Sequence, residues 1–444
     1  MHRSTKALLT LLVVATAAVA QRPVHTQGTG TIGPPVAVPG IDKPVRVIRG
    51  RFTGPVTLTN EYHYVLRGVV FIGRGADLTI QAGTRIVGEF ATLGTLVVEQ
   101  GGRIYALGTA GAPIVFTSDQ PVGQRNRGDW GGLIISGEAP INIPGGIGLG
   151  EGDTGRYGGT FPDDNSGVLR YVRVEFAGIE FSPDNELNGI AFQGVGRGTT
   201  VDYVQVHMNK DDGVEFFGGT VDAKHLVLTN IGDDSLDWTF GWSGRVQYVV
   251  LQQRGDDADN GFEADNNANN NDLLPRSNPT IYNATLIGDP FADWGGESDD
   301  GMEIREGTAG TIRNFIVMGF KENGIDYSNT ATLQQAALGT LSLGSGIVFG
   351  NGLLAGTANL DSNARPILSN VHSVLVGGAN DPGLINPFDQ ASPNFRPAPG
   401  SLAMIHSPAL QPNDGFFDVA LFIGALGPDP ALDWTLGWTS YPQS

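Results

Sequence analysis

Valine-rich segments in which apolar and polar residues alternate recur along the chain. Alternation with a period of two places every second side chain on one face, which is the signal of a half-buried β-strand. Seven such strands are predicted, over residues 167–176, 200–208, 222–230, 244–252, 279–288, 310–319 and 366–375. Shorter strands between glycine turns are predicted upstream, within 76–88, 94–108, 112–118 and 130–137. The pattern therefore predicts an all-β chain of many short strands.

An acidic turn and a second short strand follow most of the long strands. These segments read DDGVEFF from residue 211, DDSLDWT from 233, DNGFEAD from 259, DDGMEIR from 299 and ENGIDYS from 322. The turns are 22, 26, 40 and 23 residues apart, and the longest step contains a polar insertion. A period of this length without helix-forming segments is typical of one coil of a parallel β-solenoid. We therefore expect a right-handed parallel β-helix with long loop insertions.

The two ends of the chain differ from the repeats. Residues 1–20 combine a basic start, an apolar run and an A-x-A cleavage site, as a secretory signal peptide does. Residues 21–50 are rich in Pro and Gly and are expected to form an N-terminal lead-in and cap. We assign the β-helix to residues 51–380. Proline becomes frequent after residue 380, so we expect 381–444 to be a C-terminal tail that caps the strand edge of the last coil.

Composition narrows the classes of partner. The formal net charge is −19, and it becomes −21 without Arg3 and Lys6 of the predicted signal peptide. Such an acidic chain is unsuited to nucleic acid or anionic membranes. Disulfides are excluded because the chain has no cysteine, and no segment after residue 20 is long and apolar enough to cross a bilayer. We expect a secreted protein, extracellular or on the outer cell surface, with the periplasm as an alternative, whose partner is an extracellular glycan or a cell-surface component. The pattern carries no signal for the oligomeric state.

Several phrases resemble a group of exported bacterial parallel β-helix proteins that is frequent among Bacteroidota-like organisms. They include ADLTIQAGTRIVG, WGGLIISGEAPIN, YGGTFPDDNSGVLRYVRVEFAG and the closing DGFFDVALFIGALGPDPALDWTLGWTS. The similarity runs over roughly residues 65–440. The resemblance implies the β-helix fold. It implies no established activity, so no catalytic residues are carried over from it.

Stacking the coils aligns the acidic turns into rows about 4.8 Å apart. The first turn position holds Asp211, Asp233, Asp259, Asp299 and Glu322, the second holds Asp212, Asp234, Asn260, Asp300 and Asn323, and the fifth holds Glu215, Asp237, Glu263, Glu303 and Asp326. Carboxylates at this spacing repel each other by roughly 3–4 kcal/mol at an effective dielectric constant of about 20. Protonation, hydrogen bonds from turn N–H groups, or Ca²⁺ bound between coils would relieve the repulsion. The candidate Ca²⁺ ligands are Glu215, Asp237, Glu263, Glu303, Asp299 and Asp300.

Aromatic residues beside the acids point to carbohydrate. The candidate stacking residues are Trp238, Trp242, Phe217, Trp294, Tyr203 and Tyr248. Pairs of carboxylates on neighbouring coils would suit a glycoside hydrolase, and the candidate catalytic residues are Asp211, Asp212, Asp233, Asp234 and Asp237. The Gly-His-Gly and Arg-x-Lys motifs that accompany paired Asp residues in polygalacturonases are not complete here, so the sequence favours a role without catalysis.

Two aromatic patterns are open to a structural interpretation as well. The phrase Asp-Trp-Thr-x-Gly-Trp occurs at 237–242 and returns at 433–438, where the acidic turn is missing. Its return favours a packing and turn device used twice. A column formed by Tyr171, Tyr203, His225 and Tyr248 on successive strands is either a packing stack or a strip for a ligand.

The sequence as a whole favours an exported β-helix that acts as a scaffold or a glycan-binding surface protein, with Ca²⁺ as the candidate cofactor. A polysaccharide lyase or a glycoside hydrolase acting on an extracellular glycan is the alternative. A second alternative is an adhesin that contacts other proteins through the long loops 138–166 and 264–298.

Overall fold

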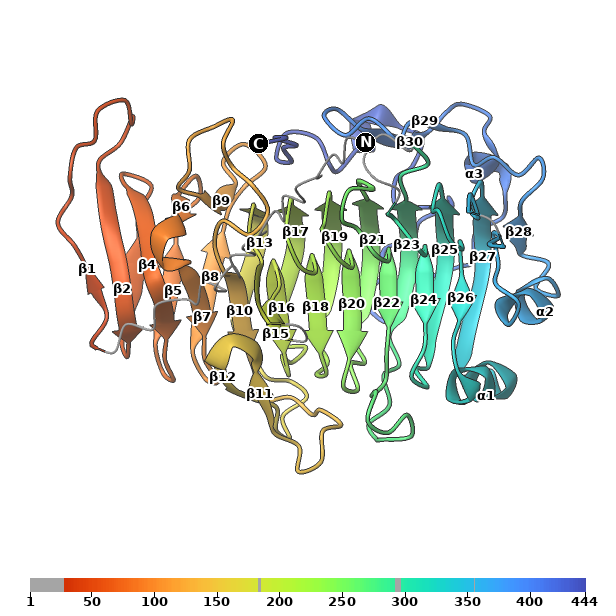
Figure 1. Ribbon diagram of the computed structural model, residues 1–444, viewed down its shortest axis with the longest axis horizontal. Coiled ribbons are helices and arrows are strands. Elements are labelled where there is room, and N and C mark those ends of the chain that lie inside the picture. Colours follow the sequence, from red (N-terminus) through yellow and green to blue (C-terminus); the bar gives the residue numbers. More distant parts are fainter. Residues whose placement is uncertain (1–27, 183–184, 292–296, 355) are drawn as a thin grey trace, which may run out of the picture.

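The computed structural model describes residues 28–182, 185–291, 297–354 and 356–444. Within them, parallel strands stack coil upon coil along the long axis of the molecule (Figure 1). The predicted fold, a parallel β-helix, is confirmed. The predicted signal peptide lies outside the described residues. None of the helices in the described part of the chain has the length and apolar character needed to cross a membrane.

One face of the coils, which we call the short-strand face, is built from strands of two to five residues. They are β7 (Thr95–Val98), β10 (Gly132–Ser136), β16 (Ile190–Gln193), β18 (Val214–Phe217), β20 (Leu236–Thr239), β22 (Phe262–Ala264), β24 (Met302–Ile304) and β26 (Asp326–Tyr327). Each pairs in parallel with the next, so that Val214 lies beside Leu236 and Leu236 beside Phe262. The repeat in the sequence is therefore one coil of the helix.

Long strands form the two other faces of the later coils. They are β13 (Gly167–Glu175), β17 (Thr200–His207), β19 (Asp222–Thr229), β21 (Arg245–Gln252), β23 (Thr280–Ile287), β25 (Gly310–Met318) and β27 (Leu341–Phe349). Each has a residue with positive φ near its middle, and these residues are Tyr171, Tyr203, His225, Tyr248, Asn283, Asn314 and Ser345. A left-handed residue interrupts the extended backbone, so each long strand turns a corner there. The aromatic column in the sequence is this corner.

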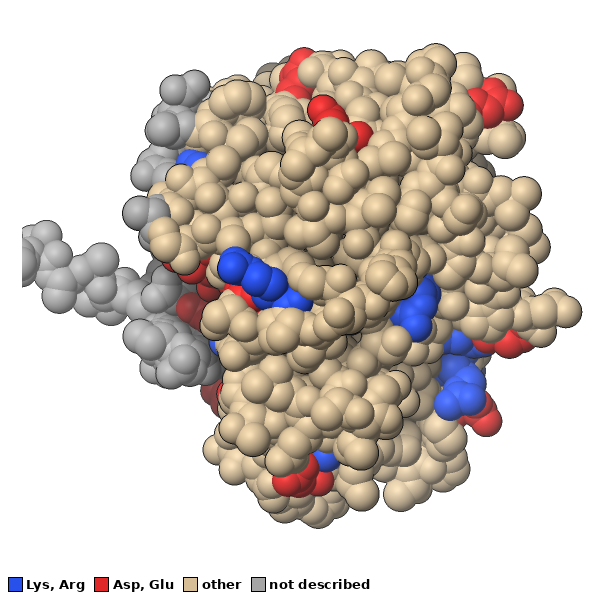
Figure 2. Space-filling view, turned by 90° about the vertical axis from the view of Figure 1, so that its right-hand side faces the viewer, with Lys and Arg blue, Asp and Glu red and all other residues tan. Residues whose placement is uncertain are grey.

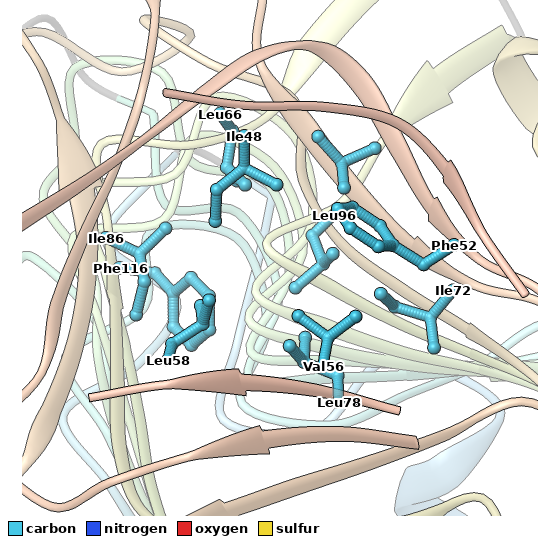
Figure 3. Close-up of a pocket in the computed structure, with 11 residues that line it drawn as sticks. Ile48, Phe52, Val56, Leu58, Leu66, Ile72, Leu78, Ile86, Leu96 and Phe116 are labelled. Atoms are coloured by element: carbon cyan, nitrogen blue, oxygen red, sulfur yellow. The ribbon is translucent and has the colours of Figure 1, made fainter. Parts of the chain in front are cut away.

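The first coils are built from shorter pieces. They comprise β1 (Thr31–Ile32), β2 (Val45–Phe52), β3 (Val56–Leu58), β4 (His63–Ile72), β5 (Asp77–Ile80), β6 (Arg85–Gly88), the 3₁₀ turn η1 (Phe90–Thr92), β8 (Arg103–Leu107) and β9 (Ile114–Ser118). Apolar side chains fill the interior of the coils, and most are fully buried. Figure 3 shows a small apolar cavity of about 10 Å³ in these coils, toward which Ile48, Val56 and Leu96 point.

The prediction of a long strand over residues 366–375 is wrong. The segment forms the helix α2 (Ala364–Leu368) and then β28 (Val374–Val376). Asp361 accepts the N–H groups of Asn363 and Ala364, which starts a helix, and Pro366 has no N–H to give to a sheet. The seventh long strand is β27 instead. Its alternation is obscured by glycine, and Gly346 is required because a Cβ there would lie 2.3 Å from the ring of Phe315.

The helices α1 (Thr330–Leu338) and α2 lie at the C-terminal end of the coil stack, where Leu333, Ala336 and Ile367 pack against the main core. Figure 2 looks onto this end of the molecule. Most of the surface there is uncharged, and the acidic and basic side chains are scattered over it. The acidic turns therefore do not gather on this end.

The C-terminal tail, which we expected over the last coil, runs back along the flank of the long strands (Figure 1). It contains β29 (Leu384–Asn386), β30 (Asn394–Pro397), α3 (Leu402–Ile405) and the 3₁₀ turn η3 (Pro430–Leu432). Three outward amide side chains each donate to and accept from the backbone of one tail residue: Gln205 with Ser440, Gln247 with Asp418, and Asn314 with Ala409. The tail is thus bonded to several coils in succession.

Candidate functional site

The outward side of the short-strand face changes character along the helix axis. Val214 and Phe216 of β18 point into the core, so Glu215 and Phe217 face outward. The row of residues in register with Glu215 is apolar in the first coils and acidic in the later ones. It runs Val97, Ile134, Ala191, Glu215, Asp237, Glu263, Glu303 and Asp326. The candidate site lies at the boundary between the two halves of this row.

Carboxylates at the second turn position accept hydrogen bonds from backbone N–H groups of the next coil. Asp212 accepts the N–H of Asp234 (3.1 Å) and Asp234 accepts the N–H of Asn260 (2.7 Å) through Oδ1. Asp300 accepts the N–H of Asn323 in the same way. These hydrogen bonds join one turn to the next, so the carboxylates of the second turn position have a structural role. Asn323, at the same position one coil later, accepts the N–H of Ala358 through its own Oδ1.

Three groups of carboxylates converge on the acidic coils. In each group the carboxylate oxygens lie within 4.8 Å of one another. The groups are Asp211 with Asp212 and Asp233, Asp212 with Glu215 and Asp237, and Asp233 with Asp234 and Asp259. Adjacent coils therefore bring acids that are more than 20 residues apart in the chain into a distance at which one cation can bridge them.

Burial and mutual repulsion raise the pKa of these carboxyls. Burial raises the pKa of Asp212, Glu215 and Asp237 well above its ordinary value, and neighbouring carboxylates raise it further. Burial and Asp259 raise the pKa of Asp233 to about 7. Two close carboxylates cannot both ionise cheaply, so these groups hold their protons to higher pH than isolated carboxyls do.

Arg305 neutralises the acids of the next coils. Its guanidinium pairs with Glu263, Asp265 and Glu303. Asp299 and Asp300 belong to the first and second turn rows, and Asp300 is bonded to Asn323. Of the six predicted Ca²⁺ ligands, Glu215 and Asp237 are therefore the two that meet in a converging group of carboxylates.

A cleft of about 400 Å³ opens beside Glu215 and Asp237. It is lined by Ile143, Leu149, Gly150, Glu151, Tyr157, Gln193, Glu215, Phe217, Asp237, Thr239, Phe240 and Asp265. The ring of Phe217 lies 6.1 Å from that of Tyr157 and 6.3 Å from that of Phe240. Aromatic rings and carboxylates thus meet in one concave surface, which is a common composition for ligand sites.

The wall of the cleft comes from the insertion between β10 and β13. Within it, β11 (Gly148–Gly150) and β12 (Gly155–Tyr157) form a hairpin that carries Tyr157, joined by the 3₁₀ turn η2 (Glu151–Asp153). A second hairpin, β14 (Ile179–Ser182) with β15 (Asn185–Leu187), lies against η2. Burial and the charge of Glu186 raise the pKa of Glu151 to about 7.

The predicted catalytic residues are spread over two neighbouring hollows and the turns between them. Asp237 lines the cleft, whereas Asp211 and Asp233 line a separate hollow of about 190 Å³. Lys210 and Asp257 also line that hollow and form an ion pair with each other. Asp212 and Asp234 are bonded to the turns described above.

The residues predicted to stack on a ligand lie in different parts of the structure. Trp238 and Trp242 are buried in the core, 1% and 0% exposed, and donate to Thr308 and Val221, so their prediction as ligand-stacking residues is wrong. Phe217 lines the cleft. Trp294 lies outside the described residues.

Tyr203 and Tyr248 belong to the corner stack, in which Tyr203 lies 4.1 Å from His225 and His225 5.0 Å from Tyr248. The tail covers this stack with Trp438, whose ring meets that of Tyr203 edge-on at 6.0 Å. The stack is therefore packed against the tail, and Trp438 is itself 1% exposed. The prediction that the Asp-Trp-Thr-x-Gly-Trp phrase is a packing device used twice agrees with this burial.

Three residues of the site escaped the predictions: Glu151, Tyr157 and Asp265. Glu151 and Tyr157 come from an insertion without a repeat pattern, so the register of the coils could not predict where they lie. Asp265 directly follows β22, and extending the alternation of that strand by one residue would have placed Asp265 on the outward side with Glu263.

Comparison with known proteins supports the fold. A family model described as a pectate-lyase-like β-helix domain matches residues 50–370. The crystal structure of the pectate lyase Pel9A is 14% identical, with 81% of this chain and 89% of that chain covered and a TM-score of 0.43. The periplasmic alginate epimerase AlgG is 12% identical, with 85% of this chain and 99% of that chain covered and a TM-score of 0.27. No curated protein sequence matches the chain.

Proposed function

Because the chain belongs to the pectate-lyase-like β-helix domain family, we propose that it is an exported protein that binds a glycan in its cleft with the help of Ca²⁺. The observation that carries the proposal is the meeting of Asp212, Glu215 and Asp237, two of which line an aromatic cleft. The exported location rests on the predicted signal peptide.

The oxygen atoms of this group fit a hard cation. Asp237 is 8% exposed, and its Oδ1 has no hydrogen-bond partner in the described part of the chain. Oδ1 of Asn188 is also buried without a partner, and the amide group of the same side chain donates to Glu215 (2.6 Å). Ca²⁺ takes six to eight oxygen ligands from carboxylates, amide carbonyls and water. A bound ion would supply the positive charge that these oxygens lack.

The charge of the cleft explains why an ion would matter for the glycan. Glu151, Glu215, Asp237 and Asp265 line the cleft, and no Lys or Arg is found among its described lining residues. A sugar with a carboxylate would be repelled from this surface unless a cation bridges the two. Phe240 is partly exposed and supplies the apolar surface on which a sugar ring packs, and the buried rings of Tyr157 and Phe217 support it from behind.

A metal titration tests the first half of the proposal. Calcium is titrated into EDTA-treated protein by calorimetry, with Asp237→Asn and Glu215→Gln as variants and Asp77→Asn, on β5 of the first coils, as the matched control. We expect saturable binding and a rise in melting temperature for the wild type and the control, and loss of both in the two variants. A cation at about 100 times its Kd stabilises the folded state by roughly 2.7 kcal/mol. Equal binding by all four proteins would overturn the assignment.

A glycan array with and without EDTA tests the second half. We expect binding in the presence of Ca²⁺, loss of binding in EDTA, and loss in Tyr157→Ala with calcium affinity retained. Absence of binding on every glycan would leave the protein without the proposed function.

Cleavage of the bound glycan, by a lyase or hydrolase reaction, is the second candidate function. Burial raises the pKa of Glu151 to about 7 and that of Asp265 to about 6, so both carboxyls titrate near neutral pH, where a general acid or base is most effective. Product release from a bound glycan that stops in Glu151→Gln, with binding retained, would establish it. Binding without product from any glycan would exclude it.

A further inference from the structure

The geometry points to recognition of a chain end: we infer that the cleft is closed on its N-terminal side and takes the terminal sugars of a glycan, with the rest of the chain leaving over the later coils. This inference rests on the proposed glycan binding and adds its specificity. A groove that is open at both ends binds the interior of a polymer, whereas a groove closed at one end selects a terminus.

Apolar packing closes the N-terminal side. The outward residues Val97, Ile134 and Ala191 are 0–2% exposed, although they stand in the same row as the acids of the cleft. They are covered by a satellite core that includes Ile141 and Tyr157. A sugar chain cannot continue along the row past Ala191 without displacing this core.

Hydrogen bonds join two insertions beside Phe240, whose carbonyl accepts the N–H of Asn142. Asn142 donates to Oδ1 of Asn266 (2.8 Å) and accepts from the amide of Asn267 (3.0 Å). Asn142, Asn266 and Asn267 are all buried. The loops 138–166 and 264–278 are therefore joined to each other here. From the sequence we considered these loops as surfaces for contact with other proteins. In the structure, Ile143, Glu151 and Asp265 from these loops line the cleft.

The opposite side of the cleft becomes gradually more open. Side-chain exposure in the acidic row rises from 14% at Glu263 to 23% at Glu303, and Asp326 is also partly exposed. The guanidinium of Arg305 lies among these acids and is 33% exposed. A glycan whose end is held beside Tyr157 therefore has a polar, accessible path along β22, β24 and β26.

Acidic oligosaccharides of defined length test the inference. The probes are oligogalacturonates from the dimer to the octamer and polygalacturonate, measured by calorimetry in saturating Ca²⁺. We expect affinity to rise over the first few sugars and then stay constant, and polygalacturonate to bind one protein per chain end. We also expect a bulky tag on one end of a tetramer to abolish binding and the same tag on the other end to be tolerated.

A variant in which the hairpin β11–β12 at the wall of the cleft is shortened tests the same inference from the protein side. Residues 146–156 are replaced by a short glycine linker, and Val122→Ala, an exposed change far from the wall, is the control. We expect several copies of the shortened variant to bind each polygalacturonate chain, and the control to bind as the wild type does. Wild-type binding in proportion to polymer length, or equal tolerance of both tags, overturns recognition of a chain end and leaves the proposed function intact. Absence of binding to every probe overturns both.

Discussion

Replacing Asp300 by asparagine should stabilise the protein at alkaline pH and leave it unchanged in acid. Asp300 is 7% exposed and accepts the N–H of Asn323 in the next coil. Asparagine at the same row position, Asn323, accepts the N–H of Ala358 through Oδ1. The substitution therefore keeps the hydrogen bond and removes a carboxyl group whose charge is poorly tolerated.

The magnitude follows from the pKa of Asp300. Burial, with the charge of Asp326 adding to it, raises this pKa from 3.8 to about 8. In the unfolded chain the carboxyl ionises above about pH 4, while in the folded chain it keeps its proton, so rising pH favours unfolding until the pH passes 8. At about 1.36 kcal/mol per pH unit, the wild type loses roughly 4 kcal/mol from this group between about pH 5 and 8. The Asp300→Asn variant avoids this loss.

Calorimetric melting in EDTA measures the difference. For a chain of about 400 residues the entropy of unfolding is on the order of 0.9 kcal/mol/K, so the expected gain is about 4 °C at pH 8 and less than about 1 °C at pH 4. The reverse change in the neighbouring coil, Asn323→Asp, should lower the melting temperature at pH 8 and not at pH 4. A gain from Asp300→Asn that is independent of pH, or a loss at pH 8, would refute the electrostatic reasoning.

Two predictions concern the C-terminal tail. His207 is fully buried and donates a hydrogen bond to the carbonyl of Pro442. Burial lowers its pKa from 6.5 to about 4. The stability that the neutral side chain contributes is therefore complete above about pH 6.5 and is lost as the pH falls toward 4. The stability difference between wild type and His207→Gln should shrink by about 2 kcal/mol between pH 7 and 5 in urea titrations, and a constant difference would contradict this. Trp438→Ala should cost roughly 3–5 kcal/mol, because a buried ring and its bond to Trp434 are lost. Hydrogen exchange should then rise in the tail and not in the coils, and unchanged exchange in the tail would exclude its docking through Trp438.

The coil architecture could be predicted because its signals are local and repeated. Val214, Leu236, Phe262 and Met302 occupy one row because each follows an acidic turn at the same distance. Alternation alone determines which side of each short strand is outward. The seventh long strand was missed for the same reason: glycine at positions 344 and 346 removes the side chains that would reveal the period.

The acids of the site were predictable as a row, but their roles were not. The sequence contains no sign that Glu263 and Glu303 share Arg305 while Glu215 and Asp237 meet each other. Trp238 and Trp242 stand beside acids in the chain and were therefore assigned to a ligand. In the coil, Trp238 points inward because it alternates with Asp237, and Trp242 is buried after the chain turns at Phe240 and Gly241.

The sequence by itself determined the repeat, the face on which the acids stand and the strands that carry them, because these depend on spacing within a few residues. The cleft was decided by the tertiary structure alone. Its wall, Tyr157, comes from an insertion that packs on Phe217, about 60 residues away in the chain. The two insertions beside the cleft are joined by a hydrogen bond between Asn142 and Asn266, which are 124 residues apart in the chain. Contacts of this kind depend on how loops fold over the finished coils, and no periodic pattern records them.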